Sequence, residues 1–240
     1  MSITKHIPNS ITSMNLLSGT LGVVFALGGR LDVAFPLMLA ASVFDFCDGL
    51  AARLLHAYSP MGKELDSLAD MVSFGVLPSV MLLETMRLHG CQCWISYLPL
   101  FLAVMSGLRL AKFNVDERQT TDFIGVATPT AALLSGALCY FMAVNPGTVL
   151  DNWAGTPWFL PGLSIVLGLL LVSEIPMFGM KVAKGHKLLD SKRIVFLSLA
   201  ALAIVFTAVF RLNWSLAVLL IFSIYLLENL VLAAIDRLRR

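Results

Sequence analysis

The chain has 240 residues and a formal net charge of +2, and 58% of its residues are hydrophobic while only 13% are charged. Soluble domains contain about 25% charged residues, and a single soluble core has no room for this much apolar surface. The composition therefore predicts a protein embedded in lipid. The small net charge gives no indication of a nucleic-acid partner.

Long apolar segments recur along the whole chain. A spanning helix needs about 20 mostly apolar residues, and eight segments come near that length: 11–29, 31–57, 64–86, 94–111, 126–145, 157–180, 193–210 and 213–235. The first follows a lysine-bearing start, as in a signal peptide, but further apolar runs follow, so we interpret it as an uncleaved span. We predict an all-α, polytopic membrane helix bundle of about eight transmembrane helices, forming one domain over residues 1–240.

The distribution of Lys and Arg predicts how this bundle is oriented, because cytoplasmic loops carry an excess of both. With a cytoplasmic N-terminus, the inner ends and loops carry Lys5, Lys63, Lys112, Arg118, Lys181, Lys184, Lys187, Lys192, Arg193, Arg237, Arg239 and Arg240. The outer loops carry Arg30, Arg87 and Arg211. We therefore expect both termini on the cytoplasmic side. The basic stretch 181–193 is interpreted as a topology determinant or a contact with anionic lipid.

Four aspartates lie near the inner ends of the second and third segments. Asp45 and Asp48 occur in FDFCDGLAARL, and Asp66 and Asp70 occur in GKELDSLADMVSFG. Spacings of three and four residues place each pair on one helical face. The turn near 58–62 folds the two helices antiparallel, so all four carboxylates are expected to converge. Ionisable residues within membrane helices are costly and point to function.

Converging carboxylates repel one another unless cations neutralise them. Their hard oxygen ligands suit Mg²⁺, Mn²⁺ or Ca²⁺, and paired ions about 3.5–4 Å apart are a recurrent device for displacement at phosphorus. The aspartates thus predict a metal-dependent phosphoryl-type reaction at the cytoplasmic surface. From the carboxylates alone, an ion or proton relay in a transporter is an equally good interpretation.

The residues between the aspartates favour the first interpretation. The stretch reads D-x2-D-G-x2-A-R-x8-G-x3-D-x3-D, with Asp45, Asp48, Gly49, Ala52, Arg53, Gly62, Asp66 and Asp70 at its specified positions. It resembles the signature of the CDP-alcohol phosphotransferase family at every one of them. The resemblance implies a six-helix catalytic core that transfers a phosphatidyl group from CDP-diacylglycerol to an alcohol. It also implies a homodimer in the bacterial cytoplasmic membrane.

The resemblance assigns roles within the signature. The four aspartates hold two divalent cations, Mg²⁺ or Mn²⁺ with Ca²⁺ as a further occupant, and Asp70 is also the general base for the incoming hydroxyl. Gly49 and Ala52 are small where the cytidine nucleotide approaches, with close helix packing as the alternative for Gly49. Arg53 suits the diphosphate or pairs with an aspartate. Gly62 permits the turn into the third helix or leaves room for the nucleotide.

Residues around the last two aspartates favour serine as the acceptor. The stretch 65–78 reads LDSLADMVSFGVLP, and it resembles the L-D-S-L-A-D-x-V-S-F-G-V-x-P segment of the family members that use serine. Members that use glycerol phosphate or inositol phosphate tend to show Pro at the position of Ser67 and Lys at the position of Met71. This chain has neither, so L-serine is the expected acceptor.

Three further residues are candidate contacts for the acceptor or the lipid. The stretch 109–115, RLAKFNV, resembles the R-L-A-R-F-N segment of the serine-using members, with Lys112 in place of an arginine. Arg109 and Asn114 are candidate contacts for the serine carboxylate, with helix-end anchoring as the alternative. Asn15 is a candidate phosphate or glycerol contact, with an interhelical hydrogen bond as the alternative. Downstream, Ala127 replaces the first proline of the family's F-x-G-L-P-x-P.

The predicted reaction is an in-line attack by the serine hydroxyl, deprotonated by Asp70, with release of CMP. The alternative within this class is a sibling enzyme that uses glycerol 3-phosphate, inositol or inositol phosphate. A phosphate-bearing acceptor would need a basic cluster near Asp70, which only Lys63 or the stretch 181–193 offers. The alternative from another class is an ion-coupled transporter, which inverted repeats with broken helices would favour; no such repeat is visible.

The cysteines show neither a disulfide framework nor a zinc-binding pattern. They are Cys47, Cys91, Cys93 and Cys139. Cys91 and Cys93 lie too close together in the sequence for an easy bridge, so all of the cysteines are interpreted as small apolar filler.

Overall fold

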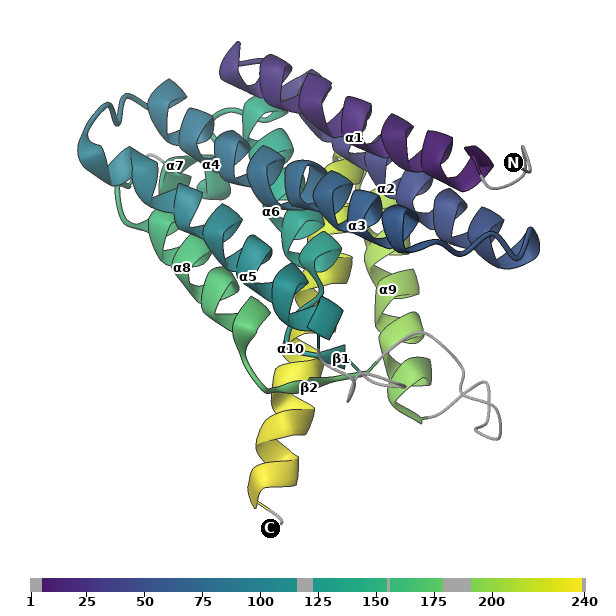
Figure 1. The fold of residues 1–240 in the computed structure, drawn as a ribbon. Coiled ribbons are helices and arrows are strands. Elements are labelled where there is room, and N and C mark those ends of the chain that lie inside the picture. The colour runs from purple at the N-terminus through teal and green to yellow at the C-terminus, as the bar shows by residue number, and fades with distance from the viewer. Residues whose placement is uncertain (1–5, 116–122, 155, 179–190, 239–240) are drawn as a thin grey trace.

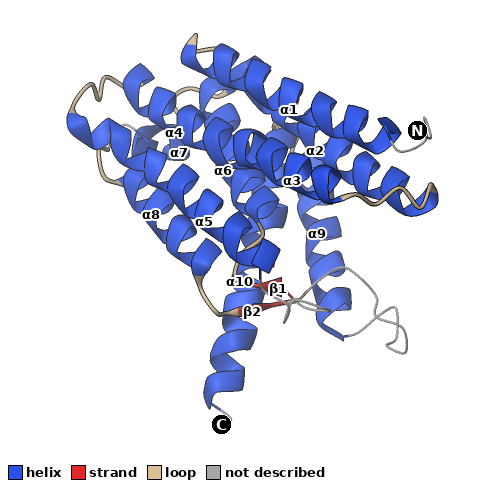
Figure 2. Ribbon diagram, in the orientation of Figure 1, coloured by secondary structure: helices blue, strands red, loops and turns tan. Residues whose placement is uncertain are grey.

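The structure is a computed structural model that describes residues 6–115, 123–154, 156–178 and 191–238. Helices make up nearly all of the described chain (Figures 1 and 2). In chain order the helices are α1 (His6–Leu27), α2 (Leu31–Leu54), α3 (Pro60–Asp70), the π-helix η2 (Met71–Val76), α4 (Leu77–Leu88), the 3-10 helix η3 (Trp94–Leu100), α5 (Phe101–Val115), α6 (Thr128–Val144), α7 (Val149–Ala154), α8 (Phe159–Val172), α9 (Ser191–Val209) and α10 (Trp214–Leu238). Two short strands, β1 (Phe123–Ile124) and β2 (Pro176–Met177), pair antiparallel.

All eight predicted apolar segments become helices. Six helices of the described residues are long and apolar enough to cross a membrane, and two of these join consecutive elements, Pro60–Leu88 (α3, η2 and α4) and Trp94–Val115 (η3 and α5). The other two segments correspond to the shorter apolar helices α6 and α8, with 17 and 14 residues. The predicted all-α, polytopic membrane bundle is therefore confirmed.

The predicted helix 157–180 is too long. The helix α8 stops at Val172, because Ser173 adopts an extended backbone with ψ 158° and the chain then pairs with β1. At this junction the N–H of Gly125 donates to the carbonyl of Ile175 at 2.9 Å. Gly125 has φ +76°, and a Cβ there would lie 2.5 Å from the Leu171 carbonyl oxygen. The pairing of β1 with β2 thus connects the end of α8 to the start of α6.

Small residues let the helices approach closely. Inside lipid the association of helices depends on van der Waals packing, because there is no hydrophobic drive between them. A Cβ at Gly22 of α1 would lie 2.6 Å from a methyl group of Leu77, and one at Gly136 of α6 would lie 2.7 Å from the Phe35 ring. These glycines allow α1 to pack closely on α4 and α6 to pack closely on α2. The helices that carry the aspartates are held in place by this packing.

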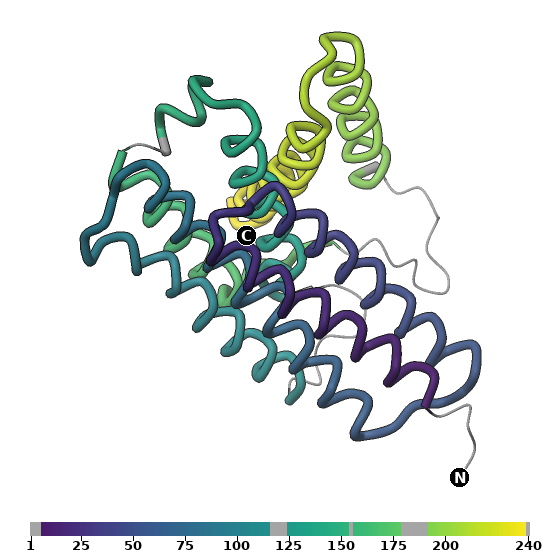
Figure 3. Tube along the Cα trace, turned by 90° about the horizontal axis from the view of Figure 1, so that it is seen from above, coloured from purple at the N-terminus to yellow at the C-terminus, as the bar shows by residue number. Residues whose placement is uncertain are grey.

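The outer faces of the helices are apolar. The helix α9 packs on α10, which in turn packs on α6, and the view from above shows α9 beyond α10, away from α1 to α5 (Figure 3). Exposed side chains on α9 include Leu202, Val205 and Val209. Such a surface is compatible with lipid rather than with water, which supports the description of this chain as an integral membrane protein.

The segments that carry the predicted site residues meet at one end of the bundle. The start of α1 and the α2–α3 turn lie at the same end, whereas the α1–α2 and α4–η3 turns lie at the other (Figure 1). The ammonium of Lys63 donates to the carbonyl of Asn114 at 3.1 Å, so the end of α5 also reaches the first end. The positions Arg30 and Arg87 fall at the opposite end. Of the basic stretch 181–193, residues up to 190 lie outside the described residues.

Candidate metal centre and active site

The four aspartates converge as predicted. Asp45 and Asp48 lie in the last turns of α2, and Asp66 and Asp70 lie on α3, which ends at Asp70. One carboxylate oxygen from each of Asp45, Asp48 and Asp66 lies within 4.8 Å of the other two. The carboxyl of Asp45 is also in hydrogen-bonding contact with those of Asp66 and Asp70. Two helices that the sequence connects through one turn therefore bring all four acidic groups together.

The start of α3 is well defined by its first residues. The Ser59 side chain caps the helix by accepting the N–H of Gly62 at 3.0 Å, and Pro60 occupies the first helical turn, where its missing N–H costs nothing. The spacing of four residues then places Asp66 and Asp70 on one face. Immediately after Asp70 the chain enters the π-helix η2. π-Helical turns are rare in proteins, and many of those that occur lie at functional sites.

The acidic cluster fits a divalent metal ion. Asp48 is only 5% exposed, and its Oδ2 is a buried atom without a hydrogen-bond partner among the described groups. None of the ion pairs found among the described residues includes any of the four aspartates. A buried carboxylate oxygen without a donor is costly, and a bound cation removes that cost. A set of hard oxygen ligands suits Mg²⁺, Mn²⁺ or Ca²⁺.

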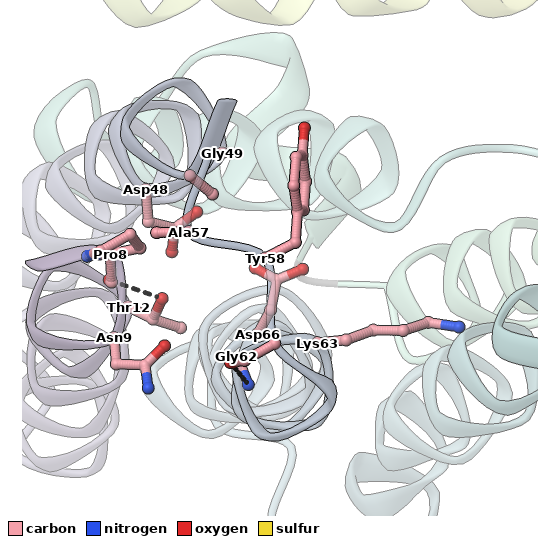
Figure 4. A pocket seen from close by; sticks show the side chains of 12 residues that line it. Pro8, Asn9, Thr12, Asp48, Gly49, Ala57, Tyr58, Gly62, Lys63 and Asp66 are labelled. Carbon is pink, nitrogen blue, oxygen red and sulfur yellow. Dashed lines mark hydrogen bonds between the residues drawn. The ribbon is translucent and has the colours of Figure 1, made fainter. Parts of the chain in front are cut away.

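A pocket of about 210 Å³ adjoins the aspartates. The carboxyl groups of Asp48 and Asp66 point into the same space between α2 and α3, while the Lys63 side chain extends away from them (Figure 4). The first turns of α1, the end of α2, the α2–α3 turn and the first turns of α3 form the walls, through Pro8, Asn9, Thr12, Gly49, Ala52, Ala57, Tyr58, Ser59, Gly62 and Lys63. The acidic cluster and this pocket thus form one continuous site.

The two signature glycines differ in their surroundings. A Cβ at Gly49 would meet only the Arg53 guanidinium, at 3.7 Å, so the alternative of close helix packing at Gly49 is wrong. A Cβ at Gly62 would lie 3.0 Å from both Asn9 Oδ1 and Ser59 Oγ. Gly62 lies inside α3 and is not among the glycines with positive φ. Its small size therefore serves the close approach of α1 and the helix cap, not the turn.

Arg53 lies at the border of the pocket. Its side chain is exposed, and its Nε donates to the Gly49 carbonyl of the same helix at 2.9 Å. The ion pair with an aspartate that the sequence left open does not occur, since none of the ion pairs among the described residues involves Arg53. The guanidinium remains beside Gly49, where the pocket begins.

Asn15 contacts Asp70, whereas Arg109 interacts with Asp70 only through its charge. The amide nitrogen of Asn15 donates to Asp70 Oδ1 at 3.4 Å, so the interhelical hydrogen bond is the interpretation that the structure supports. The Oδ1 of Asn15 stays buried without a partner among the described groups. Arg109 is 7% exposed and donates from Nη1 to Thr128 Oγ1 at 3.0 Å. Its Nε is buried and has no such partner, and its charge acts on Asp70.

Asn114 has a different environment from Arg109. Its Nδ2 donates to Ser67 Oγ at 2.9 Å, and its carbonyl accepts from Lys63. Asn114 therefore anchors the end of α5 to α3, in agreement with the alternative of helix-end anchoring.

Asn15 is the residue of α1 that the sequence predicted at the site, and the contribution of Pro8, Asn9 and Thr12 to the pocket comes from the structure. Pro8 and Thr12 are buried on the face of α1 that also carries Asn15. A signal was present, because Thr12, Asn15, Gly19 and Gly22 form a stripe of polar and small residues at helical spacing. The part played by Tyr58, in the turn, has no comparable signal.

Comparisons with known proteins agree with this geometry. Residues 5–170 match the family of CDP-alcohol phosphatidyltransferases, a range that contains the first six apolar helices almost completely. A Mycobacterium tuberculosis protein named CDP-diacylglycerol–serine O-phosphatidyltransferase is 35% identical over 179 residues, which cover 71% of this chain and 60% of that protein. The chain thus spans 60% of the length of this mycobacterial relative.

Relatives with the same name occur in other bacteria. The Bacillus subtilis protein is 37% identical over 133 residues, or 54% of this chain and 72% of its own length. The Helicobacter pylori protein is 32% identical over 195 residues, or 80% of each chain. Together with the match over residues 5–170, these findings show that the chain belongs to the CDP-alcohol phosphatidyltransferase family.

Proposed function

We propose that the protein is a phospholipid-synthesising enzyme that transfers the phosphatidyl group of CDP-diacylglycerol to L-serine, giving phosphatidylserine and CMP. The observation that carries the proposal is the meeting of Asp45, Asp48 and Asp66 within 4.8 Å beside a pocket. The names of the relatives support serine as the acceptor. The residues Ser67 and Met71 support it as well, since neither matches the phosphate-using members.

The acidic cluster is the proposed cofactor site. Asp45, Asp48, Asp66 and Asp70 would hold two divalent cations, Mg²⁺ or Mn²⁺, and the unpaired Oδ2 of Asp48 supports this assignment. When bound, the cations supply positive charge to the diphosphate oxygens and so stabilise the developing charge at phosphorus.

Asp70 is the proposed general base. An alcohol is a weak nucleophile at neutral pH, so its proton must pass to a base as the new bond forms. The serine oxygen forms a bond to the phosphatidyl phosphorus, the bond from that phosphorus to CMP breaks, and CMP leaves with the electron pair. The hydrogen bond from Asn15 to Asp70 Oδ1 restricts the rotation of the carboxyl group that would accept the proton.

The pocket between α1, α2 and α3 is the proposed nucleotide site. The open space above Gly49 and the small side chain of Ala52 leave room for the cytidine. Gly62 contributes by keeping Asn9 and the helix cap close to the pocket. Arg53 is placed at the border, where its planar guanidinium can bond two oxygens of the diphosphate.

Arg109 is the proposed contact for the serine carboxylate. A guanidinium that is almost completely buried needs a partner for each N–H, and its Nε has none among the described groups. A carboxylate would satisfy it and would bring the serine hydroxyl toward Asp70. The departure at Ala127 does not weaken this assignment, since Ala127 has φ −69°, the angle that a proline would impose.

The proposed orientation places the acidic cluster on the cytoplasmic side of the bacterial inner membrane, with both termini cytoplasmic. Lys63 lies at the same end as the aspartates, whereas Arg30 and Arg87 lie at the other end, as the positive-inside bias requires. The lipid-linked donor would enter laterally and serine from the cytoplasm. We further propose that residues 1–240 form one domain, since α10 packs on α6, and the family resemblance supports a homodimer.

The decisive assay offers several acceptors in parallel. Purified protein in detergent would receive CDP-diacylglycerol and Mn²⁺ or Mg²⁺, with serine, glycerol 3-phosphate or inositol, and CMP release would be measured. We expect release with serine, its loss on chelation, and its recovery when the metal is restored. Asp70→Asn should abolish turnover in folded protein. Release only with another acceptor would contradict serine, and no release with any acceptor would contradict the enzyme class.

A further inference from the structure

Two cysteines meet in the turn between α4 and η3. The sulfur atoms of Cys91 and Cys93 are 3.3 Å apart, Cys93 is exposed, and Cys91 is half-buried. The turn follows from Gly90, which has φ +84° and lets the N–H of Cys91 donate to the Met86 carbonyl at 3.0 Å. The two thiols therefore contact each other within this turn.

The surroundings make the two thiols chemically unequal. The two thiols share a hydrogen bond. Together with the backbone N–H groups of Ile95 and Ser96, the contact with Cys91 lowers the pKa of the Cys93 thiol. The shared proton raises the pKa of the Cys91 thiol. An exposed thiol that is readily ionised is a nucleophile, and a second thiol in contact with it is placed to resolve what it forms.

This pair is separate from the proposed active site. The α4–η3 turn lies at the opposite end of the bundle from the aspartates (Figure 1), which in the proposed orientation is the outer side of the membrane. Disulfides form and persist in such oxidising surroundings. The other two cysteines differ, since Cys139 is fully buried and Cys47 lies half-buried within α2.

We propose that Cys91 and Cys93 form a redox-active dithiol that closes into an intramolecular disulfide by exchange with a disulfide-bearing oxidant. The Cys93 thiolate attacks one sulfur of the oxidant, which forms a mixed disulfide and releases the first thiolate. Cys91 then loses its proton and attacks the Cys93 sulfur, which releases the second thiolate. The pair loses two electrons and two protons in all, and the disulfide of the oxidant is reduced to two thiols.

The closed form should be easy to reduce. A ring that joins residues two positions apart is small, and strained or exposed disulfides are the labile ones. The site is therefore expected to switch with the thiol–disulfide balance of its surroundings rather than to act as a permanent staple.

The test uses the full chain in detergent with oxidised and reduced glutathione as the probe. After acid quenching and alkylation, mass spectrometry is applied to the fragment that contains both cysteines. In the oxidised chain neither cysteine should carry an alkyl group, and the fragment should be about 2 Da lighter than the reduced fragment without alkyl groups. Dithiothreitol should restore both groups. In Cys91→Ser, glutathione should remain attached to Cys93, because no second thiol releases it. In Cys93→Ser, the reaction of Cys91 should be about tenfold slower or more.

Three results would overturn the proposal. The first is a wild-type fragment that keeps both alkyl groups under conditions in which Cys91→Ser becomes glutathionylated. The second is a persistent glutathione adduct on the wild-type chain, and the third is oxidation that only links two chains. Both serine variants should retain CMP release under reducing conditions, which shows that they are folded. The thiol measurement does not depend on that assay, so failure of the proposed function would leave this result interpretable.

Discussion

The side-chain amide of Asn15 donates to Asp70 Oδ1 at 3.4 Å, which joins two residues 55 positions apart in the chain. Asn15 is fully buried in α1, and its own Oδ1 has no partner among the described groups. Asp70 lies where α3 passes into the π-helix η2. The first helix therefore holds the carboxyl group that the account assigns as the general base.

Asn15→Ala should reduce kcat by about tenfold or more, because a positioned general base contributes about 10²–10⁴-fold and its orientation would be lost. The KM for CDP-diacylglycerol should change little. Ser18→Ala is the matched control on α1, the helix of Asn15. It removes a hydrogen bond of 2.8 Å from Ser18 to the Leu37 carbonyl on α2, and that bond does not involve the aspartates. Steady-state kinetics would contradict the account if both variants lost the same activity, or if Asn15→Ala lost none.

The two pocket glycines should respond differently to the same change. Gly49→Ala adds a Cβ in open space, so the protein should unfold at an equal or higher temperature, since alanine is favoured over glycine by about 1 kcal/mol within a helix. Its KM for CDP-diacylglycerol should nevertheless rise about tenfold. Gly62→Ala presses on Asn9 and Ser59 and should lower both thermal stability and affinity. An unchanged KM in Gly49→Ala would show that the nucleotide binds elsewhere.

Arg109→Lys should raise the KM for serine by about tenfold and leave that for CDP-diacylglycerol nearly unchanged. Lysine keeps the charge but loses the planar fork that a carboxylate recognises. Lys112→Arg is the control on the same helix, where the ammonium makes an exposed 3.5 Å ion pair with Glu174. That variant should behave like the wild type. A rise in both KM values for Arg109→Lys would indicate a structural role instead.

The far end of the bundle offers a test of stability against pH. Asp151 accepts from His89 Nε2 and from the Gly147 N–H, both at 2.6 Å. Burial alone would raise the pKa of Asp151, but these hydrogen bonds outweigh it and hold the pKa below its ordinary value. A lowered carboxyl pKa contributes stability that is present above the unfolded pKa and is lost as the pH falls through the folded one.

Asp151→Asn should therefore lower the free energy of unfolding by about 1–2 kcal/mol at pH 7, the range for a partly exposed charged hydrogen bond. The difference from the wild type should begin to shrink as the pH falls below about 4 and should disappear once the pH is below the folded pKa of Asp151. Thermal unfolding in detergent across this range would measure it. Asp32→Asn, which breaks an exposed pair with Arg30, should have a smaller effect at every pH. If the difference in free energy of unfolding between Asp151→Asn and the wild type stayed the same at every pH, the stabilising role of the Asp151 carboxylate would be refuted.

The sequence predicted the parts of this molecule that depend on local pattern. The spacing of Asp45, Asp48, Asp66 and Asp70 follows from helical geometry, and a single short turn leaves the two helices few ways to pack. The apolar segments follow from their length, because lipid selects for it. The family signature then narrowed a general acidic site to one class of chemistry.

The features that were missed depend on contacts between distant segments. Nothing in the residues of η2 signals a π-helix, and the early end of α8 depends on the pairing of Met177 with Phe123. The partners of Asn15 and Asn114 lie on other helices, so the choice between their alternative roles needed the fold. The contact of Cys91 with Cys93 arises from the backbone at Gly90, which sequence spacing does not reveal.

The central claim is that the serine hydroxyl itself attacks the phosphatidyl phosphorus. It is tested most directly with L-serine that carries a heavy oxygen isotope in its hydroxyl group, supplied with CDP-diacylglycerol, Mn²⁺ and purified protein. Mass spectrometry should find the heavy oxygen in phosphatidylserine and none in CMP, with the two products formed in equal amounts. CMP released without phosphatidylserine, or phosphatidylserine without the heavy oxygen, would contradict the account.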